Sequence, residues 1–74
     1  MRPAADRQSV LDVLADSDGA LRGIERDLVL EVKSLAALSD PPLPLIGELN
    51  VLRANVRGLR AVLSKTRDAA EAWR

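Results

Sequence analysis

Residues 39–44 read Ser-Asp-Pro-Pro-Leu-Pro, and this stretch divides the chain into two halves. A proline inside a helix removes a backbone N–H and clashes with the preceding turn, so three prolines within four positions exclude a helix interior. Each proline also pushes the residue before it towards extended geometry. Pro44 suits the first turn of a following helix. The stretch therefore predicts a rigid connector at 39–44 between two separate elements.

The second half carries an apolar repeat that is typical of a coiled coil. Apolar or small residues recur from Leu45 to Trp73 in alternating steps of four and three, which is the 3.5-residue period of a coiled-coil seam. Leu49 is taken as heptad position a, and position d lies three residues after each a. The pattern predicts a helix over about 45–73. Its apolar seam residues are Leu45, Leu49, Leu52, Val56, Leu59 and Leu63.

The first half repeats the same pattern and predicts a helix over about 4–38. Leucine occupies four successive a positions from Leu14 to Leu35, whereas position d is polar at Ser17 and Glu31. A leucine series at this spacing forms one continuous stripe on a helix. The apolar seam residues of this half are Leu14, Leu21, Ile24, Leu28, Leu35 and Leu38.

The start and the continuity of this first helix are less sharply defined by the sequence. Ser9 followed by Asp12 resembles a capping box, which places a helix start near Ser9 or at Pro3. Residues 16–19 read Asp-Ser-Asp-Gly, a turn signal, and a break there would give a three-helix bundle. The seam keeps its phase across these residues, which favours one long helix.

Two long helices joined by a short connector fold back on each other as an antiparallel hairpin. We therefore expect a single all-α domain over residues 1–74, coiled-coil-like and antiparallel. Folding at the prolines brings together residues whose numbers sum to about 83–85, such as Leu28 and Val56.

Charged and polar residues support this register. The e positions of the two helices flank each other in an antiparallel pair, so Glu25 should approach Arg60 and Asp18 should approach Arg67. The polar d residues Ser17 and Thr66 also meet. Exposed ion pairs of this kind each contribute less than about 1 kcal/mol, so they select the orientation more than they add stability.

The composition excludes several classes of function. The chain has no Cys and no His, which removes zinc sites, disulfides and His-dependent catalysis. Lys and Arg number 11 and so do Asp and Glu, and Trp73 is the one aromatic residue, which argues against a nucleic-acid binder. Residues 16–25 partly resemble a calcium-binding loop, but Leu14 takes the position of the first carboxylate ligand. We expect no catalytic residue, no cofactor and no metal.

The two halves differ in charge although the whole chain is neutral. Residues 1–40 hold five basic and eight acidic side chains, a net charge of −3. Residues 41–74 hold six basic and three acidic side chains, a net charge of +3. The two helices should therefore attract each other, or the matching helices of a second copy.

The helices are more apolar near the connector than a hairpin requires. A helix that is apolar on most faces is normally buried, and two helices cannot cover this surface alone. We expect a second copy, forming a symmetric four-helix bundle, or another protein as the partner. The candidate partner-binding residues are Val29, Leu30, Val32, Leu43, Ile46 and Val51.

Four arginines follow one flank of the second helix. The structural interpretation is ion pairing with the first helix, with Arg57 solvated. The functional interpretation is a grip on phosphate, on nucleic acid or on an acidic partner. We favour the structural one. The residues of this basic flank are Arg53, Arg57, Arg60 and Arg67.

A further set of residues occurs in a fixed order along the two predicted helices: 20–23 (Ala-Leu-Arg-Gly), Glu31, Lys33, Leu35, Leu49, Asn55, Leu59 and Leu63. This order resembles the FlgN-type flagellar export chaperones, small helical proteins of bacterial secretion. Over residues 10–70 the likeness rests on a Gly-containing first helix with a Glu/Lys-leucine end and on an Asn- and Leu-bearing second helix. This chain is short for the family, and its spacing from Gly23 to Lys33 is tighter. The resemblance implies binding of helical or unfolded ends of secretion substrates.

Residues 1–8 are not followed by an apolar stretch that could act as a signal peptide, and no run is long enough to span a membrane, so we expect a cytoplasmic protein. The function that the sequence favours is a helical protein-interaction module of the chaperone type. The alternatives are a structural subunit of a larger complex, including a phage, and a regulatory module that uses the basic flank.

Overall fold

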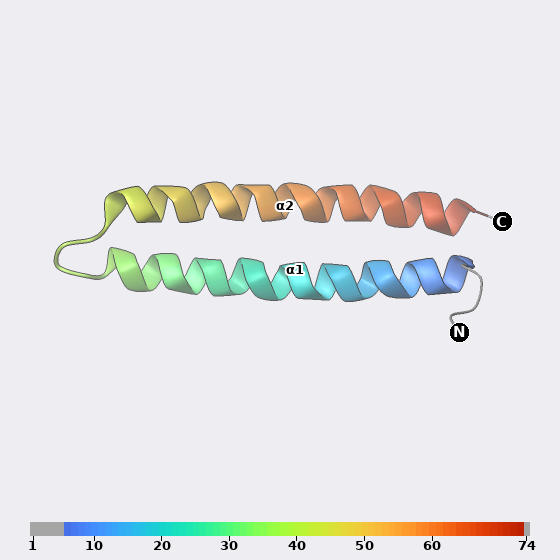
Figure 1. Cartoon of the computed structure of the whole chain (residues 1–74), viewed down its shortest axis with the longest axis horizontal. Coiled ribbons are helices and arrows are strands. Elements are labelled where there is room, and N and C mark those ends of the chain that lie inside the picture. Colours follow the sequence, from blue (N-terminus) through green and yellow to red (C-terminus); the bar gives the residue numbers. More distant parts are fainter. Residues whose placement is uncertain (1–5, 74) are drawn as a thin grey trace.

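The computed structural model describes residues 6–73 as two helices of equal length. Helix α1 spans Arg7–Ala36 and helix α2 spans Leu43–Ala72, each of 30 residues. The helices run antiparallel and lie side by side along their whole length (Figure 1). Both elements in the described part of the chain are helical, and this confirms the predicted all-α hairpin.

Helix α1 begins at a capping box formed by Asp6 and Ser9. Oδ1 of Asp6 accepts a 2.7 Å hydrogen bond from the backbone N–H of Ser9, and the Ser9 hydroxyl lies 3.4 Å from the N–H of Asp6. The predicted box of Ser9 and Asp12 is therefore wrong, because Ser9 is the third helical residue and Asp6 is the cap. Positions 4 and 5, and the alternative start at Pro3, lie outside the described residues. A reciprocal cap satisfies donors that a helix start otherwise leaves free.

Helix α1 runs without a break through residues 16–19. The three-helix alternative is therefore wrong. The Asp-Gly turn signal at residues 18–19 does not end the helix. No described residue has a positive φ, and Gly19 lies inside the continuous helix. A glycine in a helix interior costs about 1 kcal/mol relative to alanine, which the packing of a long helix can offset.

Residues 37–42 reverse the chain, so the connector begins and ends two residues before the predicted range 39–44. After Ala36 the backbone N–H groups of Ala37 and Leu38 still donate to carbonyls of the last turn, at 3.2 Å each. Pro42 is the N-cap residue of α2, and Pro44 falls in its first turn. A proline there loses no helical hydrogen bond, because the first N–H groups of a helix have no partner within it.

The contact between the two helices is made by the a rows together with the e rows. Val56 and Ala70, both at position a, are the buried residues of the described chain, with 5% and 8% of their surfaces exposed. Residues at e, such as Glu25 and Arg60, are half-buried between the helices. The remaining a leucines are half-buried as well: Leu14, Leu21, Leu28, Leu35, Leu49 and Leu63.

The predicted d-row seam residues lie outside this contact. Leu52 and Leu59 keep 46% and 55% of their surfaces exposed. Rows d and e lie on opposite sides of row a, so burying e turns d outward by about 50° relative to an a/d seam. The hairpin takes this rotation because oppositely charged side chains occupy the e rows. The exposed residues that the sequence assigned to the seam are Ile24, Leu38, Leu45, Leu52 and Leu59.

Candidate functional site

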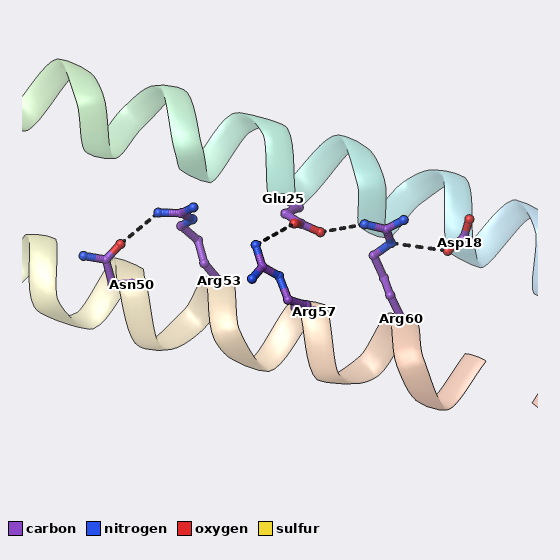
Figure 2. A network of polar contacts seen from close by, with 6 residues as sticks. All are labelled: Asp18, Glu25, Asn50, Arg53, Arg57 and Arg60. Atoms are coloured by element: carbon purple, nitrogen blue, oxygen red, sulfur yellow. Dashed lines mark hydrogen bonds and ion pairs between the residues drawn. The ribbon is translucent and has the colours of Figure 1, made fainter. Parts of the chain in front are cut away.

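One face of the hairpin carries a network of charged side chains centred on Arg60 (Figure 2). Its Nη1 donates a 2.8 Å hydrogen bond to Oε2 of Glu25, and its Nε lies 3.4 Å from Oδ1 of Asp18. Arg57 adds a longer contact of 3.7 Å to Oε1 of Glu25, and Arg22 pairs with Asp18 at 2.8 Å. The guanidinium of Arg60 therefore joins two successive acidic residues of α1 to α2.

This network shifts the pKa values of its two central residues, Glu25 and Arg60. The hydrogen bond from Arg60 lowers the pKa of Glu25, and the charges of Arg60 and Arg57 act in the same direction against the effect of burial. The hydrogen bond to Glu25 raises the pKa of Arg60, with Asp18 as a further cause. Both groups are therefore held in their charged forms, which is the state that links the helices.

The predicted pairing of charges is correct for one pair and wrong for the other. Glu25 bonds to Arg60 as expected, whereas Asp18 bonds to Arg60 and Arg22. Arg67 instead pairs with Glu71 of its own helix at 3.2 Å. The long reach of one guanidinium explains this difference, because it spans two acids one heptad apart.

The rest of the basic flank is also engaged within the chain. Arg53 donates to Oδ1 of Asn50 at 3.0 Å. Arg57, predicted to be solvated, is 74% exposed and yet lies close to Glu25. Arg57 and Arg60 pair with α1, as the structural interpretation predicts for Arg60. Arg53 and Arg67 have their partners within α2 instead.

The charged face is hollowed into a shallow groove of about 460 Å³. The side chains that line it include Ala15 and Arg22 of α1 and Ser64 of α2. All three occupy heptad position b, which directly follows position a. Rows at the same heptad position therefore share one face of the hairpin. Row d lies about 160° around each helix from row b, so the d rows of both helices share the opposite face.

That opposite face is apolar and exposed. We call Ile24 of α1 together with Leu45, Leu52 and Leu59 of α2 the apolar face. The exposed fractions of these four side chains lie between 45% and 55%. Leu38 and Trp73, just beyond the helix ends, are exposed to a similar degree. Sequence reasoning identified these residues as apolar but assigned them to the contact within the hairpin.

The candidate partner-binding residues are not brought together on one surface. Val29, Val32 and Ile46 are half-buried, the last two in the e rows between the helices. Leu30 and Val51, each 56% exposed, belong to the row that points away from the neighbouring helix. They therefore lie on opposite outer edges of the hairpin. The sixth residue, Leu43, is 69% exposed at the start of α2.

Residues 6–73 contain neither a cluster of metal-ligating side chains nor a helix that could span a membrane. No three acidic side chains there gather in an arrangement that could hold a metal ion. Neither α1 nor α2 combines the length and the apolar character needed to cross a bilayer.

Comparison with protein-family models, curated proteins and solved structures finds no match to this chain. The fold and the two contrasting faces define it as an antiparallel helical hairpin with one charged and one apolar face. The resemblance to FlgN-type export chaperones stays a prediction.

Proposed function

We propose that this hairpin is a protein-interaction module that binds helical partners through its apolar face. The observation that carries the proposal is the exposure of Leu45, Leu52 and Leu59, three leucines of a single d row that are each about half exposed. Burial of a leucine side chain contributes about 1.5–3 kcal/mol, and the hairpin leaves much of this contribution unused.

The heptad pattern supports the same proposal. A sequence in which position a is apolar or small throughout and position d is mostly apolar is typical of helices that bury both rows. The hairpin buries or half-buries its a rows, for example at Val56, and leaves the d positions from Ile24 to Trp73 exposed. A further layer of helices on the apolar face would cover the d rows, which is the arrangement of a four-helix bundle.

Chaperone and assembly functions both use this surface. A chaperone of the kind that the sequence resembles would hold a helix of an export substrate there and release it. A structural subunit would keep its partner permanently. Both are helix-in-groove binding, in which apolar anchors at heptad spacing supply the affinity.

Two leucines with almost equal exposure provide the test. Leu59, 55% exposed, lies on the apolar face, and Leu30, 56% exposed, lies on the outer edge of α1. Three tagged chains are compared: wild type, Leu59→Asp and Leu30→Asp. Each is expressed in cells together with untagged copies of the chain, and the proteins that bind to it are recovered and quantified by mass spectrometry. A central apolar anchor contributes at least about 2 kcal/mol, so Leu59→Asp should reduce recovery by at least about tenfold. Leu30→Asp should leave it within about twofold.

Helical circular dichroism of each variant controls for folding. Should Leu59→Asp lose helix, Leu59→Ala replaces it and should still reduce recovery, since it removes the same contact without adding a charge. Equal recovery for the wild type and both Leu59 variants would overturn the proposal. A loss confined to Leu30→Asp would instead favour the outer edge near the connector as the binding surface.

A further inference from the structure

The occupant of the apolar face can be inferred from the surface area and the charges of the hairpin. We propose that a second copy of the chain covers this face, with both connectors at the same end of a four-helix bundle and α1 of each copy lying against α2 of the other. This inference rests on the proposed function, since it uses the same face.

The exposed area matches one additional interface per chain. The hairpin exposes 5786 Å². A compact monomer of 8.0 kDa exposes about 4,500 Å². The excess is on the order of 1,000 Å² per chain, and a specific interface buries about 800 Å² on each partner. One copy of the hairpin docked on the apolar face would therefore remove the excess.

The charges of the helices decide between the two ways of docking. Helix α1 holds four basic and six acidic side chains, a net charge of −2, and α2 holds five basic and three acidic side chains, a net charge of +2. In the same-end arrangement, each new contact pairs α1 with α2 of the other copy, so both contacts join opposite charges. With the connectors at opposite ends, α1 would lie against α1 and α2 against α2. Like-charged helices disfavour that arrangement.

The polar residues of the d rows lead to the same choice. A two-fold axis along the helices places each level of the bundle against the same level of the second copy. Ser17 and Thr66, which the predicted register places at one level of the hairpin, would then meet the same pair of hydroxyls. In an opposite-end arrangement with its axis at the level of Ile24, this level would meet that of Glu31 and Leu52, which places a carboxylate and a leucine against hydroxyls.

The experiment measures distances between spin labels on two copies. The sequence has no cysteine, so a single introduced thiol is a unique attachment site. Ser39→Cys labels the exposed connector, and Ala61→Cys labels an exposed position near the middle of α2. Neither residue belongs to the apolar face, and circular dichroism checks that both variants keep the wild-type helix content.

The same-end arrangement predicts an inter-chain distance below about 25 Å between the Ser39→Cys labels, because neighbouring helix axes lie about 10 Å apart. It predicts a distance of similar order for Ala61→Cys. The opposite-end arrangement would separate the connectors by about 45 Å, the length of a 30-residue helix, and would keep the Ala61→Cys distance short. A long distance at the connector with a short one at Ala61→Cys would overturn the inferred arrangement.

The absence of an inter-chain distance at both positions, at concentrations up to the high micromolar range, would overturn the claim that a second copy is the occupant. That outcome leaves the proposed function to be decided by the capture experiment with Leu59→Asp and Leu30→Asp. Failure of the inference and failure of the proposed function are therefore separate results.

Discussion

Arg60 of α2 donates a 2.8 Å hydrogen bond to Glu25 of α1, 35 positions earlier in the sequence. The same guanidinium reaches Asp18, one heptad before Glu25. These contacts fix the register of the hairpin, because a shift of α2 by one turn would place Arg60 beside different side chains. They also explain why row e, rather than row d, faces the neighbouring helix.

Exchanging the two charges tests this register. Glu25→Arg and Arg60→Glu should each lower the melting temperature, since each places like charges together. The double variant should recover part of the loss, because the pair is restored in reverse while Asp18 then faces a carboxylate. Thermal melts at one protein concentration measure the effect. Asp12→Arg combined with Arg60→Glu serves as the control and should show simple addition, since Asp12 contacts Gln8 of its own helix.

The pKa of Glu25 predicts how stability depends on pH. Its pKa is lowered in the folded chain, so in acid the unfolded chain binds more protons and stability rises with pH. The contribution is complete above the ordinary glutamate pKa of about 4.3 and is lost as the pH falls through the lower folded value. Urea denaturation should therefore show a gap in the free energy of unfolding between wild type and Glu25→Gln that is constant above about pH 5.5.

This gap should close as the pH falls below about 4. A gap of equal size at pH 3 and pH 7 would contradict the role assigned to the Glu25 carboxylate. Asp27→Gln provides the comparison, since Asp27 is largely exposed and its contact to Arg26 is 3.7 Å long. That variant should follow the wild-type profile closely.

Two valines of α2 test where the contact between the helices lies. Val56 is 5% exposed and Val51 is 56% exposed, on the edge that points away from α1. Val56→Ala should lower the free energy of unfolding by about 2 kcal/mol, from lost burial and the cavity left behind. Val51→Ala should lower it by less than about 0.5 kcal/mol. Denaturant unfolding at matched protein concentration measures both, and equal effects would place the contact elsewhere.

The sequence was sufficient for the topology of the hairpin. The prolines at 41, 42 and 44 define the reversal through their missing N–H groups. The 3.5-residue period predicts a helix over about 45–73, close to the observed Leu43–Ala72. The pairing of Glu25 with Arg60 followed from the register alone. These features depend on local chemistry and on chain geometry, which a single sequence contains.

The rotation of each helix about its own axis, which decides whether row d or row e faces the neighbouring helix, was not predictable in the same way. Rows d and e flank row a equally, and hydrophobicity ranks Leu52 and Leu59 above charged residues such as Arg60 for burial. A hairpin buries one of these two rows, and contacts between Asp18, Glu25 and Arg60 favour the charged one. The apolar row then stays exposed, as at Leu52 and Leu59, and the proposed second copy would cover it.

The helix start illustrates a smaller miss with a local cause. Ser9 was recognised as a capping residue, but it acts from inside the helix as the reciprocal partner of Asp6. Asp is a preferred N-cap residue, as Ser is, and the observed box has the acid at the N-cap and the hydroxyl three residues later. An Asp three residues before Ser9 was therefore an equally valid signal.

Sedimentation equilibrium, which measures the molecular mass in solution, tests most directly whether a second copy covers the apolar face. Wild type should show twice the 8.0 kDa chain mass at high micromolar concentration, with dissociation on dilution. Glu31→Leu should lower the dissociation constant by at least about tenfold, since it replaces the one charged residue of the d rows by an apolar one in each copy. A mass of 8.0 kDa for both proteins at every concentration would contradict the account.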